Sequence, residues 1–257
     1  MHRVTIMKLT VADENVERFE EACREQTGKV KENEPGTVLC TFIRRNKTAS
    51  TILPMPPNGH TDYIHLQAYT SQEADDHHRE LEREWWGPTF RSLLSAPFTS
   101  ERYMTPDITT GITRDFDWGP HQRSFVFHRF QIKEGQDEEF EEQASHQLGV
   151  VTKGEPGTKL YTFCKRPAEG SAFLPSSNPE RTEYLHMSIY EDEEAWQQHR
   201  RLEHRDDGKW CWGPTYRQYI AVPLVNEQFR SEQIVCGLSR DAQWGTEYGD
   251  VDIAPFG

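Results

Sequence analysis

The sequence has little cysteine, no excess of positive charge and no long apolar run, and each shortage excludes a class of protein. Its five cysteines form no Cys-x-x-Cys pair, which favours reduced thiols in a cytoplasmic protein. Lysine and arginine number 29 against 42 acidic residues, and this balance argues against nucleic acid as a partner. No apolar stretch approaches the roughly 18 residues that span a membrane, and we expect no signal peptide.

What the sequence does contain is a repeated pattern. Glu-Pro-Gly-Thr occurs at 34–37 and again at 155–158, an offset of 121 residues (155 minus 34). The same offset relates Tyr63-Ile64-His65 to Tyr184-Leu185-His186, Tyr69 to Tyr190, and His78 to His199. The block Trp-Gly-Pro-Thr-Phe-Arg at 86–91 recurs as Trp-Gly-Pro-Thr-Tyr-Arg at 212–217, an offset of 126 (212 minus 86). The chain is therefore a tandem duplication of two units of about 120 residues.

Each repeat has the pattern strand, helix, strand, strand, helix, strand. Residues 4–9 alternate as a strand does, and a helix with Asp13 as its N-cap follows. The strands at 63–69 and 184–190 each lead into a helix, capped by Ser71 or Asp192. This order is the ferredoxin-like arrangement, and two such units can pack sheet against sheet. We predict an α+β fold of two ferredoxin-like units, at 1–119 and 123–246, packed as an intramolecular pseudo-dimeric α+β barrel, with a tail at 247–257.

These residues resemble the antibiotic-biosynthesis monooxygenase family of the dimeric α+β barrel group. The resemblance rests on Glu-Pro-Gly-Thr before a strand, on a strand ending in Tyr69 or Tyr190 followed by His78 or His199, and on the unit length. It implies a cofactor-independent oxygenase, an oxidoreductase that deprotonates an aromatic or phenolic small molecule for reaction with O₂. The protein would be a monomeric pseudo-dimer or a homodimer of pseudo-dimers.

Relatives of this fold leave other functions open. Proteins of this fold also include haem-binding or haem-modifying enzymes, isomerases, cyclases or lyases, and non-catalytic small-molecule binders. Two departures bear on the choice. Gln67 and Ser188 stand where the family often has glutamate, and Leu93 and Tyr219 stand where the haem-degrading branch carries an axial histidine. We therefore expect no cofactor, with haem as the alternative.

The strands at 63–69 and 184–190 supply the main candidate residues. Because side chains alternate along a strand, tyrosine and histidine share one face in both repeats. Histidine titrates near neutral pH, so we predict His65 and His186 as catalytic bases. Each could equally be a buried histidine bonded to a backbone carbonyl. The neighbouring tyrosines are predicted to bind the substrate: Tyr63, Tyr69, Tyr184 and Tyr190.

The repeated Trp-Gly-Pro block supplies a second set. Trp86 and Trp212 are predicted to wall an aromatic ligand, and Arg91 and Arg217 to hold an oxyanion. The alternative is a core tryptophan with an arginine paired to Glu82 or Glu203. His78 and His199 are further candidates, or they pack their helix. No metal site is expected, because the adjacent His77 and His78 point in different directions.

Differences between the repeats suggest that the two pockets have diverged. Met7 aligns with His128, Cys40 with Tyr161 and Gln67 with Ser188, so the second repeat is the more polar. We predict that His128 joins substrate binding and that the second repeat holds the principal site.

Overall fold

The computed structural model describes residues 2–45, 56–104, 108–118, 123–166, 180–203, 216–221, 225–230 and 233–245. The elements of the first repeat are β1 (Arg3–Ala12), a 3-10 turn (Asp13–Asn15), α1 (Val16–Asn33), β2 (Thr37–Arg44), β3 (His60–Tyr69), α2 (Gln72–Leu81), a π-helix (Glu82–Trp86), α3 (Gly87–Leu93) and β4 (Thr99–Met104). After β5 (Ile108–Thr113), the second repeat continues with β6 (Ser124–Gln131), α4 (Asp137–Gly154), β7 (Thr158–Lys165), β8 (Glu183–Tyr190), α5 (Glu193–Glu203), β9 (Val225–Arg230), β10 (Ile234–Ser239) and β11 (Ala242–Gly245).

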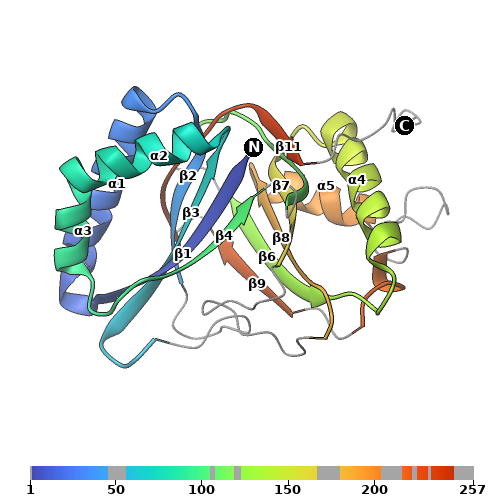
Figure 1. Cartoon of the computed structure of the whole chain (residues 1–257), viewed down its shortest axis with the longest axis horizontal. Coiled ribbons are helices and arrows are strands. Elements are labelled where there is room, and N and C mark those ends of the chain that lie inside the picture. The colour runs from blue at the N-terminus through green and yellow to red at the C-terminus, as the bar shows by residue number, and fades with distance from the viewer. Residues whose placement is uncertain are drawn as a thin grey trace.

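Two antiparallel sheets face each other across the centre of the molecule (Figure 1). The first has the strand order β10-β2-β3-β1-β4, and the second has the order β11-β5-β7-β8-β6-β9. Helices α1, α2 and α3 cover the outer face of the first sheet, and α4 and α5 cover the outer face of the second. This arrangement confirms the predicted α+β fold of two ferredoxin-like units in one chain.

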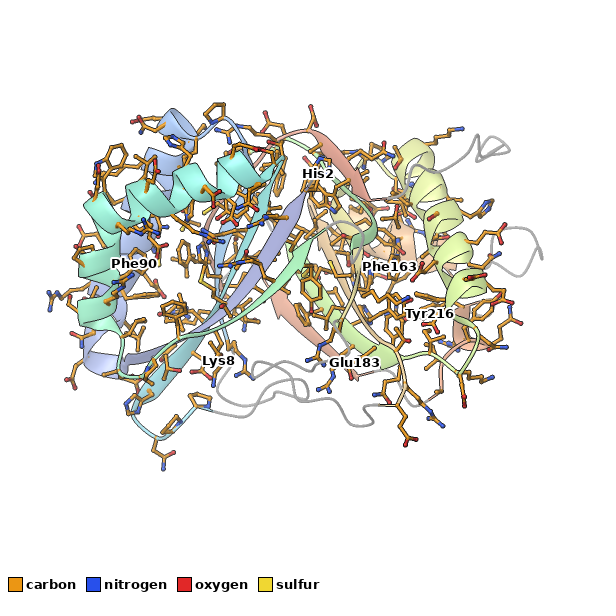
Figure 2. All side chains as sticks on the ribbon, viewed as in Figure 1. His2, Lys8, Phe90, Phe163, Glu183 and Tyr216 are labelled. Carbon is orange, nitrogen blue, oxygen red and sulfur yellow. The ribbon has the colours of Figure 1, made fainter. Side chains whose placement is uncertain are left out.

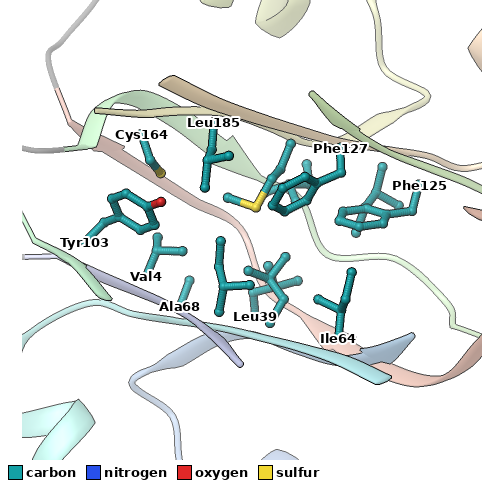
Figure 3. Close-up of a cluster of buried hydrophobic side chains, with 14 of the residues drawn as sticks. Val4, Leu39, Ile64, Ala68, Tyr103, Phe125, Phe127, Cys164 and Leu185 are labelled. Carbon is teal, nitrogen blue, oxygen red and sulfur yellow. The ribbon is translucent and has the colours of Figure 1, made fainter. Parts of the chain in front are cut away.

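The main core lies between the two sheets. On β3 the alternation predicted from the sequence places Ile64, Leu66 and Ala68 in this core, all at most 2% exposed. Phe127 and Leu185 meet them from the second sheet (Figure 3). Each large apolar side chain buried in this way contributes about 1.5–3 kcal/mol to folding. The odd-numbered residues of β3 therefore face the helices of the first repeat.

The two repeats exchange strands. β5 of the first repeat pairs with β7 of the second, and β10 of the second repeat pairs with β2 of the first. A glycine and a tryptophan meet at each exchange. A Cβ added to Gly111 would overlap the indole of Trp244, and one added to Gly237 would overlap the indole of Trp118. Only glycine fits where an indole lies this close to the backbone.

Most of the predicted helix starts agree with the structure. The hydroxyl of Ser71 accepts a hydrogen bond from the Ala74 amide at 3.2 Å, and Asp192 caps α5 in the same way at 2.8 Å. Asp13 is not the N-cap of α1, which is Asn15. A 3-10 turn intervenes, and the carboxylate of Asp13 instead accepts a hydrogen bond from the Thr61 hydroxyl.

The basic residues that follow β2 and β7 are structural. Arg45 forms an ion pair with Asp62 at 3.0 Å, and both side chains are fully buried. Arg166 and Glu183 form the equivalent pair in the second repeat. Removal of one partner from such a buried pair costs about 3–5 kcal/mol because the other charge is left unpaired. Among the described residues, no helix is both long enough and apolar enough to cross a membrane.

Candidate functional site

A pocket lies between the outer face of the first sheet and the helices of the first repeat. Its empty volume is about 420 Å³ with the open mouth included. The space inside that admits a water-sized sphere is about 30 Å³, room for about two water molecules. Phe90, on α3, closes one side of it (Figure 2). The lining residues are Met7, Leu9, Gln26, Phe42, His65, Gln67, His78, Glu82, Trp86, Gly87, Phe90, Arg91, Leu94 and Phe98.

His65 lies on the floor of the pocket and is held in one tautomer. Its Nδ1 is 3.1 Å from the carbonyl oxygen of Thr41, which can only accept, so Nδ1 carries the proton. Its ring stacks on Phe42 with centroids 3.8 Å apart. The other nitrogen, Nε2, is buried and has no hydrogen-bond partner among the described residues. Burial lowers the pKa of His65 to about 3, so the ring is neutral and Nε2 offers a lone pair.

A second buried histidine forms a chain of hydrogen bonds beside it. His78 donates from Nδ1 to the carboxylate of Glu34 at 2.8 Å, and its Nε2 is 2.7 Å from the amide nitrogen of Gln67. All three residues are at most 2% exposed. The chain fixes the ring of His78 and the amide of Gln67 in the pocket wall. Such fully satisfied buried networks hold their members in one arrangement.

Trp86 reaches the pocket through the π-helix. The Gly87 amide bonds to the carbonyl oxygen of Glu82, and a Cβ on Gly87 would lie 2.5 Å from that oxygen. Pro88 follows in the first turn of α3, where no amide hydrogen is needed. Single π turns inside helices are common at functional sites. The Trp-Gly-Pro motif therefore has a local cause: it turns the chain so that Trp86 is buried against the ring of His78, with centroids 5.6 Å apart.

Arg91 lies at the exposed side of the pocket, on α3. It makes no hydrogen bond or ion pair with any residue that the structure describes, and no contact of this kind joins it to Glu82. The guanidinium is therefore available to an anion at this position. Trp86 also has a free donor, because its buried Nε1 has no partner within the described part of the chain.

The tyrosines of β3 do not line the pocket. The hydroxyl of Tyr63 donates to Glu20 on α1 at 3.1 Å. Burial raises the pKa of this tyrosine, and the negative charge of Glu20 raises it further. Tyr69 packs against His78 with ring centroids 5.4 Å apart. Tyr63 and Tyr69 therefore do not themselves line the pocket, and Tyr69 packs on a residue that does. In the second repeat Tyr184 repeats the first contact, with its hydroxyl 2.6 Å from Glu141.

The second repeat reproduces the histidine geometry. His186 donates from Nδ1 to the carbonyl oxygen of Thr162 at 3.0 Å, and its ring stacks on Phe163. His199 donates to Glu155 at 2.8 Å, as His78 does to Glu34. Tyr190 packs on His199 with ring centroids 5.1 Å apart. Burial lowers the pKa of His186 well below its ordinary value, so this imidazole too is neutral.

The aligned differences add polar groups to this second face. His128 lies directly opposite His186 on the neighbouring strand, with ring centroids 5.4 Å apart. Burial lowers the pKa of His128 to about 4. Its Nδ1 and the hydroxyl of Ser188 are buried without a partner among the described residues. Arg217 is exposed, and Trp212 lies outside the described residues, so the prediction for Trp212 stays a prediction.

Glu34 and Glu155 are the site residues that the sequence prediction missed. Both belong to the repeated Glu-Pro-Gly-Thr motif, whose proline and glycine by themselves indicate only a turn. The available signal was that a glutamate and a histidine recur together at the same offset of 121. Glycine in this motif has a packing cause, because a Cβ on Gly36 would lie 2.6 Å from the Cβ of Ala74.

In the first repeat, the position of the axial histidine of the haem-degrading branch offers no iron ligand. Leu93, at the position where an axial histidine would stand, is apolar and buried with Phe90 and Phe19. A leucine side chain has no atom that can bind iron. Across the described ranges, no group of three or more histidine, cysteine, aspartate or glutamate side chains has an arrangement that could hold a metal.

The two facing sheets, each covered by helices on its outer face, define a single-chain α+β barrel. Residues 124–209, in the second repeat, match the family described as antibiotic biosynthesis monooxygenase. The resemblance predicted from the sequence is confirmed.

Two solved structures, both provisionally assigned as monooxygenases, match nearly the whole chain. The first, from Lactobacillus acidophilus, is 13% identical and has a TM-score of 0.68, with 95% of this chain and 99% of that chain covered. The second, from Fusobacterium nucleatum, is 12% identical with a TM-score of 0.68, and the match covers 95% and 98% of the two chains. At this identity the likeness shows the fold alone. No curated protein matches the sequence.

Proposed function

We propose that the protein is a cofactor-independent monooxygenase that acts on an aromatic or phenolic small molecule. The family match in the second repeat supports a monooxygenase-type activity. The observation that carries the proposal for the first repeat is the buried Nε2 of His65, which is unprotonated, has no partner among the described residues and belongs to a side chain lining the pocket. A phenolic or enolic hydroxyl is the kind of donor that this nitrogen would accept.

The pocket suits an aromatic ring beside that acceptor. Trp86 and Phe90 form apolar walls, and Phe42 backs the imidazole. Arg91 would offset the negative charge of a phenolate or enolate. The space admits only about two water molecules in the present arrangement, so a substrate would displace the exposed Phe98 at the mouth.

The proton transfer is linked to the binding of the anion. The pKa of His65 is about 3 in the empty pocket because burial disfavours the charged ring. A phenolate or enolate formed at hydrogen-bond distance would supply the missing counter-charge and raise that pKa. The electron-rich anion then reacts with O₂. One oxygen atom joins the substrate carbon and the other leaves as water with two hydrogens, so the substrate itself is the reductant.

In the second repeat, His186 stands at the position of His65, and His128 replaces Met7 and places a second imidazole beside it. We propose that both repeats bind substrate and that the second, with its extra polar groups, holds the principal site. The described cysteines Cys23, Cys40, Cys164 and Cys236 form no disulfide with one another. We place the protein in the cytoplasm, where such thiols stay reduced, as a single-chain pseudo-dimer or a dimer of such chains.

Oxygen uptake with anthrone-like and catechol-like compounds tests this function. His65→Gln and His186→Gln should each lower uptake, the second more strongly, and the double variant should lose about 10²–10⁴-fold, the range of general base catalysis. Thr61→Ser, which keeps a hydroxyl near Asp13 and away from the pocket, is the control and should match the wild type. Equal losses from the two single variants would contradict a principal site in the second repeat. Wild-type uptake in the double variant would contradict the role of the two histidines as bases, and no uptake in the wild type would contradict the function itself.

A further inference from the structure

Each candidate site rests on a turn that an arginine from the other repeat holds in place. Arg240 follows β10, the strand of the second repeat that pairs with β2 of the first. Its own amide bonds to the carbonyl oxygen of Val38 at 2.9 Å, which fixes the backbone beside the first repeat. The guanidinium then extends along the end of α1.

That guanidinium donates to three backbone carbonyl oxygens of the first repeat. Nη2 is 2.9 Å from the oxygen of Lys31, Nη1 is 3.0 Å from that of Glu34, and Nη1 also bonds to the oxygen of Thr37. The last carbonyls of a helix have no partner within the helix, and a cation there also complements the helix dipole. Arg240 therefore ties the end of α1 to the turn that follows it.

The same turn carries the carboxylate that holds His78. Glu34 accepts hydrogen bonds from the hydroxyl of Thr37 at 2.6 Å and from Nδ1 of His78 at 2.8 Å. His78 lines the pocket and bonds to Gln67. Glu34 and Thr37, which belong to one turn, thus connect the guanidinium of Arg240 to the wall of the pocket.

The second repeat has the mirror arrangement. Arg114, at the end of the exchanged strand β5, donates to the carbonyl oxygens of Thr152, Glu155 and Thr158 at 2.7, 2.6 and 2.5 Å. Glu155 accepts from the Thr158 hydroxyl and from Nδ1 of His199, each at 2.8 Å. Arg114 and Arg240 are 126 residues apart, the offset of the Trp-Gly-Pro block, so the device is part of the duplication.

We propose that Arg240 and Arg114 are positioning residues that act across the pseudo-dimer. Arg240 of the second repeat sets the Glu34–His78 pair of the first site, and Arg114 of the first repeat sets the Glu155–His199 pair of the second. Neither half of the chain has a complete site by itself. The role in turnover rests on the proposed function, whereas the geometric coupling stands without it.

Lysine separates positioning from charge. Arg240→Lys and Arg114→Lys keep the positive charge but replace a planar fork of donors by a single nitrogen that cannot bridge the same carbonyls. Arg201→Lys is the matched control, because Arg201 is exposed and, among the described residues, pairs only with Glu194. Full-length proteins with ¹³C-labelled histidine rings give one Cε1–H signal per histidine, and His78→Gln and His199→Gln assign the two of interest.

Each arginine variant should shift only the histidine signal of the opposite repeat. Arg240→Lys should shift the His78 signal by more than its linewidth and leave the His199 signal in place, and Arg114→Lys should do the reverse. An unmoved His78 signal in Arg240→Lys, or both signals moving in both variants, would overturn the proposal. If Arg240→Lys does not fold, Arg240→Gln is measured under the same criterion.

Oxygen uptake distinguishes this proposal from the proposed function. Crosswise shifts with no uptake in the wild type would contradict the oxygenase and support the coupling. Uptake in the wild type with unmoved ring signals in the variants would support the oxygenase and contradict the coupling. If both hold, each of Arg240→Lys and Arg114→Lys should lower the turnover of one site. Added salt should not restore that turnover, and the control Arg201→Lys should keep the turnover of the wild type.

Discussion

His65 shows how burial determines what a residue can do. An imidazole on a wet surface would be half protonated near pH 6.5. Here burial disfavours the charged form, and the Thr41 carbonyl opposes that effect only in part, so the pKa falls to about 3. The ring is kept neutral with its proton on Nδ1, and that leaves Nε2 as an acceptor in the pocket wall.

The same shift predicts a dependence of stability on pH. Between pH 6.5 and about 3, the unfolded chain carries a proton on His65 that the folded protein does not. The free energy of unfolding therefore falls as pH is lowered through this window, by up to about 1.4 kcal/mol per pH unit for this one group. His65→Gln should lessen that slope by up to one proton. Urea unfolding at several pH values measures it.

An unchanged slope in His65→Gln would show that the ring is already charged in the folded protein. That outcome would also remove the neutral acceptor on which the proposed chemistry depends. His77→Gln, on the same helix as His78 but on its exposed side, is the control for the general effect of losing a histidine.

At the scale of elements, the π-helix positions Trp86. Gly87 is required because its amide approaches the carbonyl oxygen of Glu82 so closely that a Cβ would lie 2.5 Å away. We expect Gly87→Ala to destabilise the protein by about 1–3 kcal/mol, the usual cost of overpacking. The same change should weaken the binding of aromatic ligands, because Trp86 must move.

Gly28→Ala provides the matched control. Gly28 is an exposed residue inside α1, and a Cβ there would meet nothing within 4 Å. Alanine at such a position should stabilise the protein by about 0.5–1 kcal/mol through helix propensity alone. Chemical denaturation of Gly87→Ala and Gly28→Ala measures the change in the free energy of unfolding of each variant, and the two changes should have opposite signs. A neutral or stabilising Gly87→Ala would contradict the packing account of the Trp-Gly-Pro motif.

The sequence was informative where one local rule decides an element. Alternation along residues 63–69 predicted which side chains of β3 face the core, and the caps at Ser71 and Asp192 marked two helix starts. The π turn was not predictable, because Trp-Gly-Pro satisfies the rules for an ordinary helix start. The Glu34–His78 pair spans 44 residues, and only the repeat offset hinted at it. The exchange of β5 and β10 depends on contacts between repeats, which no local pattern specifies.

At the scale of the whole molecule, the exchanged strands make two repeats into one cooperative unit. Each sheet includes a strand from the other repeat, and Trp118 and Trp244 lock those strands against Gly237 and Gly111. We therefore expect a single unfolding transition by calorimetry, with equal calorimetric and van't Hoff enthalpies. Gly237→Ala, whose Cβ would overlap Trp118, should lower the midpoint of the whole transition. Two separate transitions would contradict the exchange as a source of cooperativity.

The central claim is that the histidine face of the repeats accepts the hydroxyl of an aromatic substrate. A crystal structure of the protein with a bound anthrone-like or catechol-like compound tests it most directly. The account predicts the ligand oxygen within hydrogen-bond distance of Nε2 of His65 or His186, with the ring in the first site lying against Trp86. A ligand bound elsewhere, with both Nε2 atoms still contacting only protein or water, would contradict it.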